Sequence, residues 1–271
     1  MPVSEKYEIR DLAPRIGSEI VTDAETLLSG ACSTQIRALL EECGVVAIRG
    51  INLSDDQQIA FTKTIGTIVE EKAFKITMDP TENPVAEYIK GAFYWHIDGT
   101  MGDVPIFASL MSSRRLSDTG GQTEFSNTYA ACDDLPDSEK KALETLKVVH
   151  MFEVSQRYVN PEPSYELLQT WQQFKPNTLP LVWTHRSGRK SLVLGSTASH
   201  VEGMDLRDGW ALLTRLRDYA TQPRFVYRHE WTLGDLVIWD NTGTMHRALP
   251  YAMDSGRMMH RTTLAGEEPF A

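Results

Sequence analysis

The sequence FVYRHEWTLGDLVIWDNTGTMHRA, residues 225–248, contains the pattern that decides the predicted fold. Over residues 225–231 large side chains alternate with other residues, and this period of two predicts a half-buried β-strand. Gly234 and Asp235 predict a turn into residues 236–239, which are all apolar and predict a buried strand. We therefore expect two β-strands in succession, with His246 shortly after the second.

Further strands and several helices are predicted on both sides of this stretch. The apolar spacing over residues 36–43 predicts an amphipathic helix that Gly44 ends. Ser54 and Gln57 predict a capping box for a second helix, which ends near Gly66. Two more helices are predicted over residues 138–146 and 206–219. The other predicted strands are residues 45–48, 92–98, 107–112, 122–125 and 258–264.

Two segments have no clear periodicity and are predicted to be irregular. Residues 71–92 contain Pro80 and Pro84, and residues 155–180 are rich in aromatic residues and proline. Long irregular segments of this kind are often functional, and we expect both to be variable lids over a site. Neither a repeat nor a linker divides the chain, so residues 1–271 are predicted to form a single domain.

Composition limits the classes of partner. The 271 residues are 41% hydrophobic and 24% charged, as in ordinary globular proteins. The formal net charge of −10 argues against nucleic acid and against an anionic membrane surface. A small anionic substrate remains possible, since one or two local arginines can hold it. Three cysteines without CxxC spacing predict reduced thiols.

The chain shows no targeting feature. Residues 1–7 lack the apolar stretch of a signal peptide, and no apolar run approaches the length of a membrane span. We expect a cytoplasmic protein, and a homo-oligomer is compatible with the sequence.

A possible metal site lies in the sequence Trp95-His96-Ile97-Asp98, together with His246. Two histidines and one carboxylate are the ligand set of a mononuclear non-haem Fe(II) oxygenase, although zinc also binds these residue types. Residues i and i+2 of a strand point to the same side, so both upstream ligands can reach one metal. His246 must come from another strand or turn. The remaining histidines are interpreted as structural: His150, His185, His200, His229 and His260.

Arg257 follows His246 by eleven residues and suggests the co-substrate. 2-Oxoglutarate carries a distal carboxylate that needs a cationic clamp, and arginine binds a carboxylate through two parallel hydrogen bonds. The ligand set and this arginine together predict an oxygenase that uses Fe(II), 2-oxoglutarate and O2.

The chain resembles the taurine dioxygenase and 2,4-dichlorophenoxyacetate dioxygenase family of Fe(II)/2-oxoglutarate-dependent oxygenases. The resemblance covers almost the whole chain and is strongest over residues 92–130 and 181–269, which include Gly-Gly-Gln-Thr-Glu-Phe at 120–125 and Gly-Asp-Leu-Val-Ile-Trp-Asp-Asn at 234–241. It implies a fold that is mainly β with flanking helices, a double-stranded β-helix of the jelly-roll, cupin-like kind.

The same resemblance implies roles for individual residues. His96, Asp98 and His246 match the catalytic iron ligands. Arg257 matches the arginine that binds the C5 carboxylate of 2-oxoglutarate, and Thr123 matches a threonine that hydrogen-bonds the same carboxylate. Arg261 matches a second arginine, which reaches the C1 carboxylate or an acidic group of the prime substrate.

The implied reaction hydroxylates an unactivated C–H bond of a small molecule and releases succinate and CO2. Asp98 fills a position that related halogenases leave vacant for chloride, which favours hydroxylation. If the attacked carbon bears an ether oxygen or a sulfonate, the product collapses and the bond is cleaved. Cleavage of an aryloxyalkanoate ether or an alkyl sulfonate therefore remains an alternative outcome.

The substrate class is predicted from differences and charges. Ala92 stands where taurine dioxygenase has an asparagine, which argues against taurine. Arg257 and Arg261 are four residues apart on a predicted strand and so point the same way. An unpaired buried guanidinium would be costly, so some anion should meet Arg261. We expect a small to mid-sized substrate with an apolar body and an acid group.

Two other classes of protein compete with this interpretation. A non-catalytic β-barrel binding protein could retain the ligands by descent, and a zinc hydrolase could use the same two histidines and aspartate. Both leave Thr123 and Arg257 without a purpose.

Overall fold

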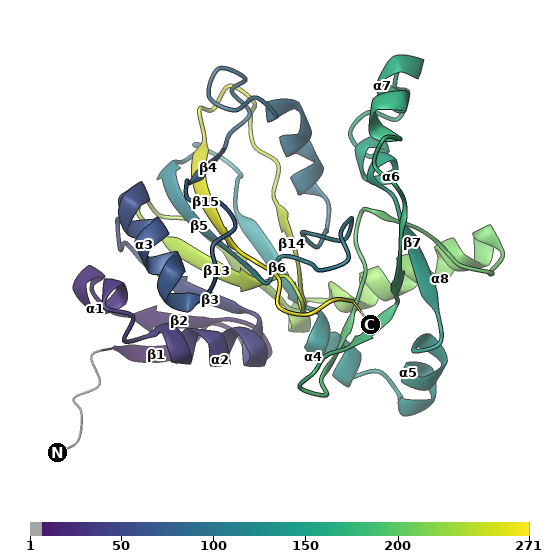
Figure 1. Cartoon of the computed structure of the whole chain (residues 1–271), viewed down its shortest axis with the longest axis horizontal. Coiled ribbons are helices and arrows are strands. Elements are labelled where there is room, and N and C mark those ends of the chain that lie inside the picture. The colour runs from purple at the N-terminus through teal and green to yellow at the C-terminus, as the bar shows by residue number, and fades with distance from the viewer. Residues whose placement is uncertain (1–6, 271) are drawn as a thin grey trace.

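A computed structural model describes residues 7–270 of the chain. It is rich in β-sheet and carries helices on its outside, as the sequence predicts (Figure 1). Residues 1–6, on which the expected lack of a signal peptide mainly depends, lie outside the described residues. Among residues 7–270, no helix has the length and apolar character needed to cross a bilayer.

The major sheet has seven strands, and all neighbours are antiparallel except β2 and β3. Its strands in spatial order are β1 (Glu8–Asp11), β2 (Ser18–Val21), β3 (Val45–Ile48), β13 (Leu236–Asp240), β5 (Ala108–Arg115), β15 (Met258–Leu264) and β4 (Phe74–Ile76). The apolar strand predicted over residues 236–239 is β13, which is buried along its whole length.

Three helices cover one face of the major sheet (Figure 1). They are α1 (Ala24–Leu28), α2 (Ser33–Cys43) and α3 (Asp55–Ile65). Gly44 ends α2 with a φ of 77°, which the prediction anticipated. The predicted capping box is also confirmed, because the side chains of Ser54 and Gln57 accept hydrogen bonds from each other's backbone N–H.

A minor sheet faces the other side of the major sheet. Its strands are β12 (Val226–His229), β6 (Thr123–Asn127) and β14 (Thr244–Ala248), with β6 in the centre. Strand alternation separates the two faces of β13: Leu236 and Ile238 pack towards the helices, whereas Val237 and Trp239 pack towards Phe125 of the minor sheet. The space between the sheets therefore has an aromatic wall.

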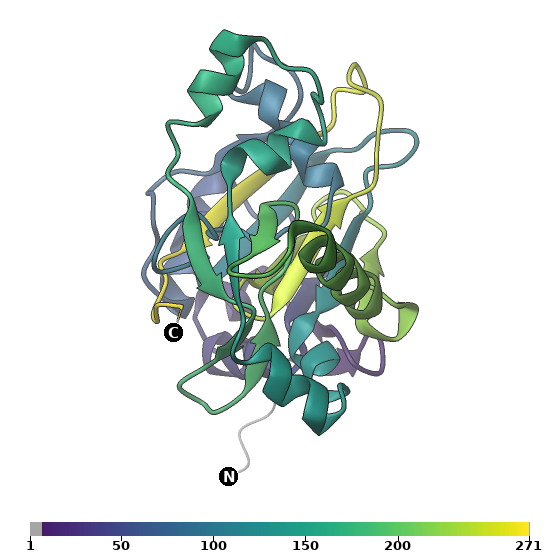
Figure 2. The ribbon, with the colours of Figure 1, turned by 90° about the vertical axis from the view of Figure 1, so that its right-hand side faces the viewer.

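The remaining elements form a lobe behind the minor sheet (Figures 1 and 2). Its sheets are β11-β7-β8 and β10-β9, made of β7 (Lys147–His150), β8 (Asn177–Pro180), β9 (Val182–Thr184), β10 (Lys190–Leu192) and β11 (Ala198–Val201). Its helices are α4 (Thr128–Asp133), α5 (Asp137–Leu143), α6 (Phe152–Arg157), α7 (Tyr165–Trp171), α8 (Leu206–Ala220) and the 3-10 turn η2 (Pro223–Phe225).

Three segment predictions were wrong in detail. The strand expected over residues 92–98 is absent, because the 3-10 helix η1 (Ala86–Phe93) extends into it and only His96 forms an isolated bridge. Residues 71–92 are not wholly irregular, since β4 adds an edge strand to the major sheet. Residues 155–180 hold the second half of α6 and all of α7 and β8. Short elements of three to eight residues give too little periodicity to be recognised.

The three cysteines are free, in agreement with the prediction. Cys32 and Cys132 are buried, and Cys43 is partly buried and donates to the Leu39 carbonyl oxygen.

The buried carboxyl of Asp240 predicts a pH-dependent stability. Burial raises its pKa to about 6, although Thr242 and Tyr129 donate hydrogen bonds to it. The folded state thus holds the proton more tightly than the unfolded state, so stability is lost as pH rises from about 4 to 6. We expect wild type to lose on the order of 2 kcal/mol relative to Asp240→Asn across this window.

Urea unfolding at pH 4, 5, 6 and 7 would measure this difference. The exposed aspartate variant Asp56→Asn is the control and should follow wild type. Parallel pH profiles for wild type and Asp240→Asn would contradict the assignment.

Candidate metal centre

Two backbone hydrogen bonds bring the predicted histidines together. His96 N donates to the His246 carbonyl oxygen at 3.0 Å, and His246 N donates to the His96 carbonyl oxygen at 2.9 Å. Directly opposed residues of an antiparallel pair project their side chains to the same face. The two imidazole rings accordingly lie 4.1 Å apart between centroids.

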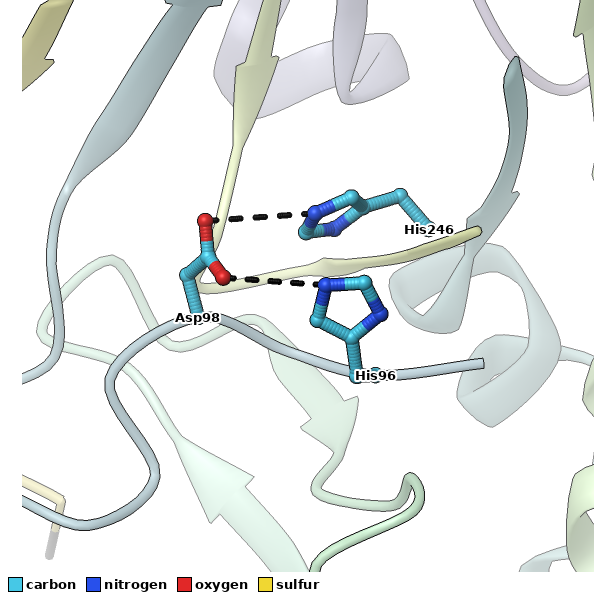
Figure 3. Close-up of side chains that lie close together, drawn as sticks. All are labelled: His96, Asp98 and His246. Carbon is cyan, nitrogen blue, oxygen red and sulfur yellow. Dashed lines mark ion pairs between the residues drawn. The ribbon is translucent and has the colours of Figure 1, made fainter. Parts of the chain in front are cut away.

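Asp98 completes the cluster from a turn rather than from a strand (Figure 3). His96 Nε2 lies 3.7 Å from Asp98 Oδ1, and His246 Nε2 lies 3.9 Å from Asp98 Oδ2. One ligand atom from each of the three residues lies within 4.8 Å of the others. The argument from strand spacing was therefore wrong for Asp98, although the three residues converge as predicted.

Two of the three side chains, Asp98 and His246, have the protonation states that a metal requires. Burial alone would raise the pKa of Asp98, but the positive surroundings, chiefly the charge of Arg261, outweigh it and lower the pKa to about 2. Burial, with the charges of His96 and Arg261, lowers the pKa of His246 well below its usual range. An ionised carboxylate and a neutral imidazole are the ligating forms.

Contacts with neighbouring residues orient the two histidine ligands. His96 Nδ1 lies 2.8 Å from the Tyr94 carbonyl oxygen, which can only accept, so Nδ1 donates this hydrogen bond and Nε2 is the nitrogen that faces Asp98. The His246 ring packs against Trp239 at 4.8 Å and Phe125 at 6.3 Å between centroids. Trp239 therefore forms one side of the centre.

Trp95, which precedes His96 in the sequence, does not line the centre. Its ring is under the guanidinium of Arg247, 4.7 Å away, on the opposite face of β14 from His246.

Arg261 approaches the centre, but its partner differs from the prediction. Its Nη1 donates to Asp98 Oδ2 at 3.0 Å, so the anion expected opposite this arginine is the protein's own carboxylate. Its Nε is buried without a hydrogen-bond partner among the described residues. Sequence reasoning missed this ion pair because nothing in the sequence signals that residues 98 and 261 meet.

Arg257 lies beside Gly121, in the turn that precedes Thr123 of β6. Arg257 precedes β15, and a bulge at Met258 and Met259 interrupts the spacing to Arg261, so the two arginines do not share one regular strand. Arg257 is only 3% exposed, and its Nη2 donates to the Gly121 carbonyl oxygen at 2.9 Å. The part of the chain that the structure describes offers it no ion pair.

Thr123 has a partner that the sequence did not reveal. Trp231 Nε1 donates to Thr123 Oγ1 at 3.0 Å across the minor sheet. The only available signal was the position of Trp231 on the alternating stretch 225–231.

The other five histidines lie outside the cluster and contact other side chains. His185 pairs with Glu268, His229 with Asp235 and His260 with Asp55, at 2.8, 3.1 and 2.7 Å. His150 contacts Thr197 and His200 contacts Ser199.

The geometry suits one metal ion. Nitrogen and oxygen ligands bind first-row metals at about 2.0–2.2 Å, so donor atoms 3.7–3.9 Å apart can share one ion. These separations are too long for hydrogen bonds. Three ligands on one side leave open positions for other molecules, the arrangement of metal-dependent oxygen chemistry.

Comparisons with known proteins agree with this geometry. The model of the family "Taurine catabolism dioxygenase TauD, TfdA family" matches residues 8–263. An alpha-ketoglutarate-dependent 2,4-dichlorophenoxyacetate dioxygenase from Burkholderia sp. (strain RASC) is 34% identical over 88% of this chain and 87% of its own length. An alkylsulfatase from Acinetobacter baylyi is 31% identical over 97% of this chain and 86% of its own.

A solved structure is also similar. The crystal structure of AAD-2 in complex with Mn(II) and N-oxalylglycine has a TM-score of 0.85 and 33% identity, covering 98% of this chain and 99% of that one.

The cluster predicts the effect of removing one ligand. We expect Asp98→Ala to weaken Mn(II) binding by more than the 10–100-fold typical for loss of a second-sphere partner, because a direct charged ligand is lost. Isothermal titration with Mn(II) measures this affinity. His200→Ala, a histidine outside the cluster, should bind Mn(II) as wild type does. An Asp98→Ala protein with undiminished affinity would refute the metal centre.

Proposed function

Because this chain belongs to the taurine catabolism dioxygenase TauD, TfdA family, we propose that His96, Asp98 and His246 hold Fe(II) for a 2-oxoglutarate-dependent dioxygenase reaction. The enzyme class uses Fe(II), 2-oxoglutarate and O2. The observation that carries the proposal is the convergence of two imidazoles and one carboxylate on one side of a single position. Bound Fe(II) supplies the activation of O2, coupled to conversion of 2-oxoglutarate into succinate and CO2.

Arg257 is proposed to bind the distal carboxylate of 2-oxoglutarate. A buried guanidinium without an acidic partner carries a large desolvation cost, which an anionic co-substrate would offset. A guanidinium has five N–H donors, so beyond the bond to Gly121 it has donors for a bidentate contact with a carboxylate. Tyr251 supports the guanidinium from one side, with its ring centroid 4.7 Å away.

Thr123 is proposed to donate its hydroxyl hydrogen to the same carboxylate. Because Thr123 Oγ1 already accepts from Trp231 Nε1, its own hydrogen points away from Trp231. Trp231 is thus a positioning residue, and the edge of its ring packs against His229, which Asp235 fixes in turn.

The two lid segments are proposed to exclude water. Tyr88 of η1 packs on Phe152 of α6 at 5.9 Å between centroids, and the Tyr94 hydroxyl donates to the Tyr158 carbonyl oxygen. A cavity of about 380 Å³ lies between the segments and has mostly apolar walls. Closure by such segments protects an oxidising reaction from solvent.

The prime substrate is proposed to be a small or mid-sized organic acid with an apolar body. Support comes from the relatives, whose names specify 2,4-dichlorophenoxyacetate and alkyl sulfates, both anions with apolar bodies. Because Asp98 already pairs with Arg261, a substrate anion is not needed to balance this arginine. The Nε of Arg261 has no partner among the described residues and can donate to a substrate anion.

The outcome is proposed to be hydroxylation of a C–H bond held near the metal. With an aryloxyacetate, hydroxylation of the ether carbon gives a hemiacetal-type product that collapses to a phenol and an oxo acid. One O2 and one 2-oxoglutarate are consumed in each case. We also propose that residues 1–271 form one domain and that the major and minor sheets are the two sheets of a jelly roll.

Succinate formation tests the function against its competitors. Aryloxyalkanoates, alkyl sulfates and sulfonates, fatty acids and terpenoid acids are incubated with Fe(II), 2-oxoglutarate and O2, and succinate and O2 uptake are measured together. A zinc hydrolase or a binding protein would release no succinate and consume no O2, and that result would sink the proposal.

The substitution Trp231→Phe is predicted to weaken the binding of 2-oxoglutarate selectively. The variant keeps an aromatic ring but removes the donor to Thr123, so we expect the Kd for N-oxalylglycine with Mn(II) to rise about five- to tenfold, near 1 kcal/mol for one hydrogen bond. Mn(II) affinity should not change. In a Thr123→Val background the same substitution should have little further effect, because the acceptor is gone. Additive losses would indicate a role in packing alone.

The acid group of the prime substrate is tested with a matched pair of molecules. Once a substrate is found, wild type should turn over the acid at least tenfold more efficiently than its primary amide. Arg261→Gln should reduce this preference, whereas Arg186→Gln, an exposed arginine elsewhere, should keep it. Equal turnover of acid and amide by wild type would contradict the proposal that the prime substrate carries an acid group.

A further inference from the structure

The minor sheet has a second face, turned away from the metal centre. In β6 and β14 the residues next to Phe125 and His246 are Glu124 and Arg247, and they project to the opposite side. A cavity of about 1090 Å³ lies between this face and the helices α6 and α8. Figure 2 views the molecule from the side that carries α8.

The cavity carries an excess of positive charge. Glu124 is 5% exposed and accepts hydrogen bonds from both Arg228 and Arg247, at 2.6 and 2.8 Å, so one carboxylate faces two guanidiniums. Burial would raise the pKa of Glu124, but these two arginines lower it, and the carboxylate is ionised. The triad thus keeps one net positive charge.

A further guanidinium at the rim is not neutralised. Arg157 at the end of α6 lines the cavity, and no ion pair to it is found within residues 7–270. Arg217 of α8 is balanced by its neighbour Asp218. The cavity therefore has a formal net charge of +2, in a chain whose total is −10. A local reversal of sign of this kind attracts anions.

The other walls are apolar and aromatic. Trp95 lies beneath Arg247, Trp210 of α8 is 57% exposed, and Tyr158 is 45% exposed. Trp210 is held in place, because its Nε1 donates to the Ser199 carbonyl oxygen at 2.9 Å. Fixed aromatic faces beside guanidiniums suit a ligand with a flat or apolar body and an anionic end.

We propose that this cavity binds a small amphipathic organic anion, with an aromatic or alkyl body and one carboxylate or sulfate group. The anionic end meets Arg228 and Arg157, and the body lies between Trp210 and Tyr158. The site is separate from the metal centre, because His246 and Arg247 lie on opposite faces of β14. It holds a ligand of the substrate's chemical class without reaching the reacting atoms.

Calorimetric titration with 2-naphthoate tests the site. The protein is first saturated with Mn(II) and N-oxalylglycine, so that the probe does not compete for the metal. We expect saturable binding to wild type, and at least tenfold weaker binding of the neutral 2-naphthamide. The double variant Arg157→Gln/Arg228→Gln should lose at least tenfold in affinity, whereas Arg157→Lys/Arg228→Lys should bind within a few-fold of wild type.

A steric variant and two controls locate the bound probe. Thr214→Trp on α8 places a bulky ring in the cavity and should also abolish binding, while Arg186→Gln and Arg261→Gln should bind as wild type does. Circular dichroism establishes that each variant is folded.

Three outcomes would overturn the proposal. The first is that wild type shows no saturable heat of binding with 2-naphthoate. The second is that the double variant and Thr214→Trp both bind the probe with unchanged affinity. The third is that only Arg261→Gln loses affinity for the probe, which would place the probe in the catalytic pocket.

Discussion

The candidate centre depends on one pair of backbone hydrogen bonds, those that join His96 to His246. The pair fixes both imidazoles on one side of the chain and leaves Asp98 only a short turn away. Gly195 is needed beneath it, because a Cβ at that position would lie 3.0 Å from His96 Cα. The φ of 125° at Gly195 is also one that other residues rarely adopt. The geometry of the centre thus depends first on main-chain packing and only then on the side-chain rotamers.

Strand alternation places neighbouring residues around this pair on opposite faces of the minor sheet. Within β14, His246 joins the aromatic space between the sheets, and Arg247 joins a charged cluster outside. Within β6, Thr123 and Glu124 divide in the same way. The inner face of these two strands therefore carries His246 and Thr123, whereas the ion pairs of Glu124 with Arg228 and Arg247 lie on the outer face. That separation matters because a stray buried charge would alter the protonation of the ligands.

Much of the fold could be predicted from periodicity, and most of the cluster from residue types. The helix ended by Gly44 and the apolar strand β13 follow from local pattern. The strand expected at His96 does not exist, because tertiary contacts, here a single bridge, replaced a ladder that the apolar pattern suggested. The pairing of Arg261 with Asp98 and the bond from Trp231 to Thr123 join residues more than a hundred positions apart. One sequence contains no measure of such proximity, so these contacts became visible only in three dimensions.

The bridge between His96 and His246 also determines when the centre can form during synthesis of the chain. The two residues are 150 positions apart, and the strands that hold them pair only when most of the chain is present. A growing polypeptide on the ribosome offers His96 and Asp98 alone, which is too few donors to retain a metal ion. The three candidate metal ligands therefore come together only in a chain that has been completed beyond His246 and has folded.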